Sequence, residues 1–323
     1  MLKRALSKGV LVLAGSFLFI TSAPAQEWKP AGTIALNTST QGGSADTIGR
    51  LLGPRLGERL GVPVIIEYQR TSAGTAAFQR VARSAPDGRT IMFASAATAA
   101  QAAVRDDLGF DLLKDFSMLG MLVSYPFVVM VRPESSIQNI ADLIKEAKAR
   151  PGHVTFTRLG VGSFHHLLGE WIALEGGVSM QAIPYRGVPD AMTDVRAGRV
   201  DLLIAPAANA SGFIQNGLMR AIGISSDKRH PLLPDVSPIA ETLPTIYAES
   251  WLGLLAPATT PPVIVARLNA EMRAVLALPE VRALLFKLGN APDPSTPEQM
   301  RARVVREMAI WKRIVDAKGI KIE

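Results

Sequence analysis

The chain has 323 residues, of which 48% are hydrophobic, with no cysteine and a formal net charge of +7. Without cysteine, a disulfide framework, a thiolate nucleophile and lipid attachment through a cysteine are excluded. The basic residues form no run of five or more and do not alternate with aromatic residues, so nucleic-acid binding has little support. The length allows two domains of ordinary size that depend on their hydrophobic cores for stability.

The N-terminal segment, residues 1–25, has the parts of a secretory signal peptide. Lys and Arg at positions 3, 4 and 8 make its start positive, and residues 9–20 are apolar. Ala23-Pro24-Ala25 then provides the small residues that signal peptidase accepts. A retained membrane anchor is the alternative, but it needs about 20 apolar residues. We expect cleavage near Ala25 and export, which removes three positive charges and leaves +4 of the +7.

After this segment, short apolar strands alternate with helices. The predicted strands are residues 33–36, 64–68 and 90–94, and the predicted helices are residues 47–60, 76–83 and the alanine-rich 94–103. A turn at Ala85-Pro86-Asp87-Gly88 precedes the third strand. This alternation predicts a parallel sheet with helices on both faces.

The same alternation starts again after Asp115 and gives way to a helical C-terminal part. The predicted strands are residues 127–131, 154–157, 182–184, 200–204, 221–224 and 251–256. The predicted helices are residues 140–149 (capped by Asn139), 165–174, 189–198, 261–276, 281–287 and 297–318. One face of the last helix should be buried, because apolar residues recur on it at Met300, Val304, Met308, Trp311 and Val315.

Two glycine-bearing loops, residues 38–46 (TSTQGGSAD) and 158–166 (RLGVGSFHH), each connect a predicted strand to a predicted helix. A helix start leaves backbone N–H groups unpaired and carries the positive end of the helix dipole, so it can bind an anion without a charged side chain. In open α/β sheets, ligands bind outside the carboxyl ends of the strands, where both loops fall. Packing explains either glycine loop equally well when it is taken alone. Two such loops in two lobes favour a binding function.

Several side chains near these loops have two interpretations each. Asp46 either caps its helix or accepts a hydrogen bond from the ligand. Arg158 either clamps a carboxylate in bidentate fashion or is a solvated arginine at a strand end. Phe164, Tyr185 and Trp251 either flank a ligand or belong to the core, and for His166 a capping or structural role is the simpler interpretation.

The motifs of other function classes are absent from the sequence. There is no P-loop, and Gly160-Val161-Gly162 lacks the third glycine of the dinucleotide fingerprint. Ser163 is not in a G-x-S-x-G elbow, and no third group is indicated to orient a Ser163–His166 pair. The four histidines have no metal-ligand spacing, so neither a metal nor a cofactor is expected.

Eight short motifs, in this order and spacing, resemble the substrate-binding proteins of tripartite tricarboxylate transporters, the Bug family of periplasmic receptors. They are GGSAD at 42–46, APDG at 85–88, KDF at 114–116, GVGSFHHLLGE at 160–170, PYRG at 184–187, AGRVD at 197–201, LPDV at 233–236 and WLGLLAP at 251–257. The resemblance covers essentially the whole chain after the predicted signal peptide. It implies a non-catalytic, monomeric receptor in the periplasm that delivers a small carboxylate to membrane transporter subunits.

The same resemblance implies a type II-like α/β periplasmic binding protein with two lobes, joined by two crossing strands that close around the ligand. Lobe 1 is expected at residues 26–124 plus 249–323 and lobe 2 at 125–248, with hinges near 124–125 and 249–250. The carboxylate would be bound through backbone amides, bridging waters and residues of both lobes. The expected residues, with Arg158 added from its position beside the second loop, are Thr40, Gln41, Gly43, Asp46, Ser95, Arg158, Ser163, Phe164 and His165.

The sequence departs from the family pattern around the expected pocket. Thr38-Ser39 replaces the usual Pro-Phe or Pro-Tyr, Arg158-Leu159 replaces small polar residues, and Ala205-Pro206 replaces a common polar pair. These changes put the identity of the carboxylate in doubt but not the fold. Two alternative functions stay open at this point, a periplasmic hydrolase that uses Ser163 and His166, and a solute-sensing subunit of a signalling receptor.

Overall fold

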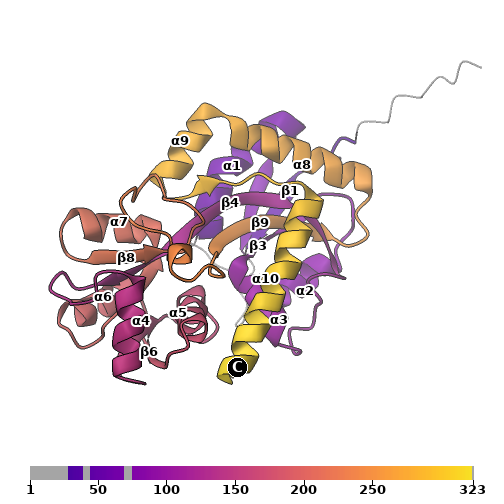
Figure 1. The fold of residues 1–323 in the computed structure, drawn as a ribbon. Helices are drawn as coiled ribbons and strands as arrows, with labels where there is room; N and C mark the ends of the chain where they lie inside the picture. Colours follow the sequence, from indigo (N-terminus) through magenta and orange to yellow (C-terminus); the bar gives the residue numbers. More distant parts are fainter. Residues whose placement is uncertain (1–27, 39–43, 69–74, 322–323) are drawn as a thin grey trace, which may run out of the picture.

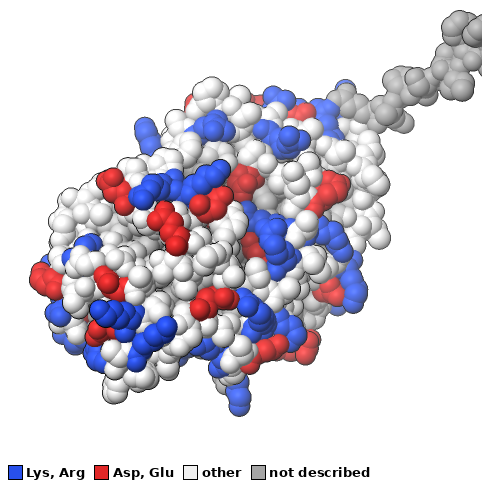
Figure 2. Space-filling view, in the orientation of Figure 1, with Lys and Arg blue, Asp and Glu red and all other residues white. Residues whose placement is uncertain are grey.

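The computed structural model describes residues 28–38, 44–68 and 75–321, so the predicted signal peptide lies outside the described residues. Figure 1 shows an α/β molecule with two lobes, and the C-terminal helix α10 (Pro297–Lys318) runs along both. Among the described residues, no helix combines the length and the apolar character that a membrane crossing requires. Charged side chains of both signs are interspersed over the face in Figure 2.

The first lobe is built around a mixed sheet in the order β10-β4-β9-β3-β1-β2. Its parallel part and the accompanying helices are β1 (Ile34–Thr38), α1 (Ser44–Leu60), β2 (Val64–Tyr68), α2 (Thr75–Ala82), β3 (Thr90–Ser95) and α3 (Ala96–Val104). Its antiparallel part is β4 (Phe116–Val131), β9 (Glu249–Pro257) and β10 (Ala291–Pro292). Helices α8 (Pro262–Ala277) and α9 (Pro279–Lys287) follow β9. The predicted strands 33–36, 64–68, 90–94 and 251–256 are confirmed, with ends that differ by at most two residues. The prediction of 127–131 was too short, because β4 begins at Phe116, and β10 was not predicted.

The second lobe continues from the same strand, β4. Its elements are α4 (Ile140–Ala149), β5 (Val154–Arg158), α5 (Phe164–Glu175), β6 (Met180–Pro184), α6 (Val188–Arg196), β7 (Leu203–Pro206), α7 (Ala207–Gln215) and β8 (Arg220–Ile224). Both β7 and β8 pair antiparallel with the second half of β4, and β5 pairs parallel with β6. Asn139 caps α4 by accepting a hydrogen bond from the Asp142 backbone N–H at 2.9 Å, as the sequence predicted.

The two strands that connect the lobes pair with each other. Tyr125 on β4 lies opposite Ser250 on β9, and Pro126 lies opposite Glu249. The two segments predicted as hinges are therefore neighbours in one antiparallel ladder. Pro126 has no backbone N–H, which a strand tolerates at a position where its ladder ends.

Helix α10 connects the cores of the two lobes. Met300, Val304, Trp311 and Val315 are buried, which confirms the predicted apolar face. Trp311 contacts Trp171 of α5 with ring centroids 5.6 Å apart, and Arg313 forms an ion pair with Glu175 at 2.6 Å. The helix thus packs on α3 in one lobe and on α5 in the other (Figure 1).

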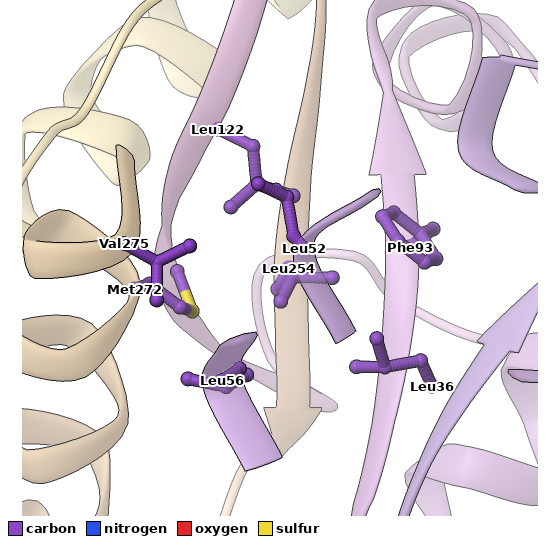
Figure 3. A pocket seen from close by; sticks show the side chains of 8 residues that line it. All are labelled: Leu36, Leu52, Leu56, Phe93, Leu122, Leu254, Met272 and Val275. Atoms are coloured by element: carbon purple, nitrogen blue, oxygen red, sulfur yellow. The ribbon is translucent and has the colours of Figure 1, made fainter. Parts of the chain in front are cut away.

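A small void lies in the core of the first lobe, between the sheet and helices α1 and α8 (Figure 3). Its volume is about 10 Å³, and its lining is wholly apolar: Leu36, Leu52, Leu56, Phe93, Leu122, Leu254, Met272 and Val275. A cavity of this size holds one water at most and offers it no polar partner. It is therefore a packing defect and cannot hold an organic ligand.

Candidate ligand-binding site

The loop between β5 and α5 is held in shape by two glycines and a serine cap. Gly160 and Gly162 have φ angles of 97° and 72°, which other residues rarely adopt. The Ser163 hydroxyl donates a hydrogen bond to the Gly160 carbonyl oxygen at 2.8 Å and accepts one from the His166 backbone N–H at 3.3 Å. Ser163 is therefore the cap of α5, with its proton already engaged by a backbone carbonyl.

The buried His166 ring supports the same loop from inside. Its Nδ1 accepts a hydrogen bond from the Gly162 backbone N–H at 3.2 Å, and its Nε2 lies 3.7 Å from Glu170 Oε1. Burial, and in second place the positive charge of Arg158, lowers the pKa of His166 to about 4, so the ring is neutral at pH 7. The Ser163 hydroxyl and the His166 ring each bond to a backbone group and not to each other. They are therefore not a nucleophile–base pair, and the hydrolase hypothesis has no base to activate Ser163.

His165 is different, because its ring nitrogens are unused. Both are buried and have no hydrogen-bond partner within the described part of the chain. The ring stands at 88° to Phe127 of β4, with centroids 4.9 Å apart. Burial lowers the pKa of His165 to about 4, so the neutral ring offers one donor and one acceptor to a partner that the described residues do not supply.

Arg158, the last residue of β5, has a side-chain nitrogen without a partner in the described part of the chain. Its Nε is buried and finds no acceptor among the described residues. Its backbone carbonyl accepts a hydrogen bond from the Tyr185 N–H at 2.9 Å, which fixes the strand end. After burial, the positive charge of Arg158 is the second cause that lowers the pKa of His166 in α5.

Three aromatic residues that the sequence placed near the ligand are packed elsewhere. Phe164 is 7% exposed and stacks on Phe127 at 4.4 Å, with Trp311 at 5.6 Å on another side. The Trp251 indole is fully buried and donates to Glu307 at 2.7 Å. The hydroxyl of Tyr185 donates to Asp194 at 2.7 Å. The simpler interpretation, a role in packing, fits all three rings, and Phe164 keeps only its backbone N–H for a ligand.

On the other side, Asp46 in the first turn of α1 is bound to its own lobe. Its Oδ1 accepts hydrogen bonds from Arg50 Nε at 2.8 Å and from the Tyr68 hydroxyl at 2.7 Å. This buried carboxylate ties the helix start to β2, and the hydrogen bond to it is the first cause that raises the pKa of Tyr68. The neighbouring predicted residues Thr40, Gln41 and Gly43 lie outside the described residues.

Ser95 caps α3 at the end of β3. Its hydroxyl accepts a hydrogen bond from the Thr98 backbone N–H at 3.4 Å and lies 3.3 Å from the Thr98 hydroxyl. The Thr98 hydroxyl in turn accepts from the Ser95 N–H at 3.2 Å, which completes a capping box. Ser95 is thus a helix cap at the carboxyl end of a strand, the same position that Ser163 holds in the other lobe.

The sequence analysis missed Tyr125, which links the starts of α1 and α5. Its hydroxyl lies near Ser250 of β9 and Ser44, the first residue of α1, and both lower the pKa of Tyr125 against the larger effect of burial, which raises it. Phe127, two residues along β4 and hence on the same face of the strand, contacts Phe164 and His165 at the start of α5. The Tyr125 and Phe127 rings are 6.0 Å apart. Both helix starts therefore reach one stretch of β4, from opposite lobes.

Residues 48–320 match the family described as TctC, the tripartite tricarboxylate transporter family receptor. The chain belongs to this receptor family. A sequence relative, protein BugT of Bordetella pertussis, is 30% identical over 285 residues, which cover 87% of each chain. The family consists of binding proteins, and this receptor is accordingly not an enzyme.

Solved structures of similar proteins agree with this receptor fold. The structure of the periplasmic binding protein BugD is 26% identical and covers 91% of the receptor and 100% of BugD, with a TM-score of 0.72. MatC of Rhodopseudomonas palustris, solved with bound malate, is 28% identical over 88% of the receptor and 99% of MatC, with a TM-score of 0.71. A second R. palustris protein, solved with adipate, is 28% identical over 91% and 99%, with a TM-score of 0.73.

Proposed function

We propose that this receptor works in the periplasm, where it captures a small carboxylate between its lobes and delivers it to the membrane subunits of a tripartite tricarboxylate-type transporter. The observation that carries the proposal is the position of the two helix starts. Ser44 of α1 lies near Tyr125, and His165 of α5 packs on Phe127, so both starts adjoin one face of β4. The first N–H groups of a helix have no partner within the helix, and together with the helix dipoles they favour an anion held between the two starts.

The energetics of such a site do not require a buried acidic or basic partner. Each charge-assisted hydrogen bond contributes about 1.5–3 kcal/mol, and a helix dipole adds about 0.3–1 kcal/mol. Four to six such bonds offset an association cost of at least about 4 kcal/mol. Micromolar affinity corresponds to about −8 kcal/mol, which this arrangement can provide.

The relatives support a carboxylate as the ligand class. MatC was solved with malate and the second R. palustris protein with adipate, and both compounds carry two carboxylates. The family name supports the transporter partner. The signal-like residues 1–25 and the periplasmic relative BugD support the location.

We further propose that capture closes the two lobes, residues 26–124 with 249–323 and residues 125–248, about the paired strands. The support is the ladder that joins Tyr125 to Ser250 and Pro126 to Glu249, since rotation there moves both connections together. Small-angle scattering should show a smaller radius of gyration with ligand than without it. Identical curves for the free and the bound protein would contradict closure.

A thermal-shift screen of the purified protein tests the function itself. The panel contains mono-, di-, tri- and aromatic carboxylates, with the matching amides as uncharged controls. We expect one or more carboxylates, and none of the amides, to raise the melting temperature. Native mass spectrometry adds a search for a ligand retained from expression. If no carboxylate shifts the melting temperature and no anion is retained, the proposed function is wrong.

A further inference from the structure

Among the described residues, no acid pairs with the guanidinium of Arg158, unlike Arg50 with Asp46 at 2.8 Å and Arg303 with Asp293 at 2.8 Å. Its buried Nε also has no acceptor there. Arg220 and Arg267 share an unbonded buried Nε, but Arg220 donates to three backbone carbonyls and Arg267 pairs with Glu271. Burying part of a cation in this way is unfavourable unless something binds it.

The surroundings of Arg158 make the same place more positive. Arg158 ends β5, and the loop 159–163 leads from it directly into α5, where the positive charge of Arg158 is the second cause that lowers the pKa of His166. The start of α5 carries the positive end of its helix dipole. His165, in the same turn, has two buried ring nitrogens without partners among the described residues. The cation of Arg158, the start of α5 and the neutral His165 ring thus belong to one strand-to-helix connection. An anion with several acceptor oxygens can accept hydrogen bonds from all three.

The chain also brings Arg158 to the edge that faces the crossing strands. Leu202, just before β7, bridges Phe156 on β5, and Pro206 at the end of β7 pairs with Phe127 on β4. The ends of β5 and β7 and the entry of β4 into the second lobe therefore share one sheet edge. Arg158, at the end of β5, and the Phe127–His165 contact, at the first turn of α5, both lie on this edge.

We propose that Arg158 binds a second carboxylate of the ligand, with His165 as a hydrogen-bonding partner of the same ligand, so that the receptor selects dicarboxylates over monocarboxylates. The inference rests on the proposed function, in which backbone N–H groups at the two helix starts hold a first carboxylate. A monocarboxylate is satisfied by those groups and leaves Arg158 unpaired. The planar guanidinium presents parallel N–H donors, which match a carboxylate in bidentate geometry.

Isothermal titration with matched ligand pairs tests this assignment. Succinate is compared with butyrate, adipate with hexanoate and terephthalate with benzoate, so that each pair differs by one carboxylate. The wild-type protein should bind at least one dicarboxylate about 10-fold or more tightly than its partner. Arg158→Ala and the longer, uncharged Arg158→Gln should each weaken that dicarboxylate about 10- to 100-fold and its monocarboxylate partner less than about threefold.

A control variant, and unfolding curves recorded for every variant, separate an effect on ligand binding from an effect on folding. Arg196→Ala removes one exposed positive charge from the same lobe and should leave both members of each pair unchanged. Equal weakening of both members by the Arg158 variants, or a wild-type protein without preference for the dicarboxylate, overturns the inference and leaves the proposed function standing. A wild-type protein that binds no carboxylate overturns both. If Arg158→Ala does not fold, Arg158→Gln decides.

Discussion

The rings of His165 and Phe127 meet at 88° with their centroids 4.9 Å apart. This contact joins the first turn of α5 to the strand that passes between the lobes. Two residues earlier, Tyr125 makes the corresponding connection to α1 through Ser44. The crossing strand thus positions both helix starts, although those starts are far apart in the sequence.

Replacing Tyr125 by Phe should weaken ligand binding. The change removes the hydroxyl that lies near Ser44 and Ser250 and leaves the ring in place. A lost hydrogen bond between neutral groups costs about 0.5–1.5 kcal/mol, so we expect the dissociation constant to rise up to about 10-fold in titration calorimetry. Tyr247→Phe, at a tyrosine that is 41% exposed, is the control. Unchanged affinity in Tyr125→Phe would show that the two helix starts do not need this connection.

Replacing Ser163 by Ala should destabilise the protein without removing any hydrolytic activity. The variant loses the α5 cap, which accepts from the His166 N–H at 3.3 Å, and such losses cost about 0.5–2 kcal/mol. Urea unfolding measures the change, with the exposed Ser179→Ala as control. Ester turnover in the wild type that disappears in Ser163→Ala would contradict the receptor assignment.

Acid should destabilise the protein through His165 and His166. The folded pKa of each is lowered to about 4, whereas the unfolded value is about 6.5. Between these values the unfolded chain binds more protons, so the free energy of unfolding decreases as the pH falls from about 6.5 to about 4. We expect a loss of about 1–2 kcal/mol per ring at pH 5 relative to pH 7.

Histidine variants isolate this contribution from that of the carboxylates. In His165→Asn, the difference in unfolding free energy between pH 7 and pH 5 should be smaller than in the wild type. His153→Asn, at an exposed histidine, should keep the wild-type difference. A His165→Asn variant with the full wild-type pH dependence would mean that folding does not lower the pKa of this ring.

Replacing Gly169 by Ala should disturb the packing of α5 on β5 and destabilise the protein. A Cβ at this position would lie 2.2 Å from a ring carbon of Phe156, which is fully buried and cannot move aside. Overpacking of this kind costs about 1–3 kcal/mol. Gly212→Ala is the matched control, because a Cβ there meets nothing within 4 Å, and it should stabilise α7 by about 0.5–1 kcal/mol. Equal unfolding midpoints for the two variants would contradict the close packing of α5 on β5.

Local patterns in the sequence predicted most of the elements. Asn139 before an apolar periodic run identified the start of α4, and the apolar spacing from Met300 to Val315 identified the buried face of α10. The glycine-bearing loop 158–166 preceded a predicted helix that began at residue 165, one residue after the observed start of α5 at Phe164. Each of these signals depends on residues within about one or two helical turns, so one sequence is enough to recognise it.

The full length of β4 did not follow from the sequence. Only residues 127–131 were predicted, whereas the strand runs from Phe116 to Val131. Gly120, with φ 135°, and Pro126 interrupt the local pattern, and both are usual signals against a strand interior. The ladder with β9 shifts register near Gly120, between Met118 and Gly120, and ends at Pro126. Gly120 and Pro126 fit into the strand because β4 pairs with β9, which lies more than a hundred residues away in the sequence. A local sequence pattern does not reveal this pairing.

The candidate site was predictable at its backbone but not at its side chains. The glycine loop and the helix start after it follow from residue types at a strand-to-helix turn, whereas the cap at Ser163 was not predicted. The direction of Phe164 does not, because its ring is placed by Phe127 and Trp311 from distant segments. Tyr125 was missed for the same reason, since its partner Ser44 comes from the other end of the lobe.

A crystal structure of the protein with the carboxylate that gives the largest thermal shift tests the central claim most directly. The account predicts one carboxylate group between the starts of α1 and α5, within about 3 Å of backbone N–H groups of both helices. Density for the ligand at any other place, or contacts with only one of the two helix starts, would contradict it.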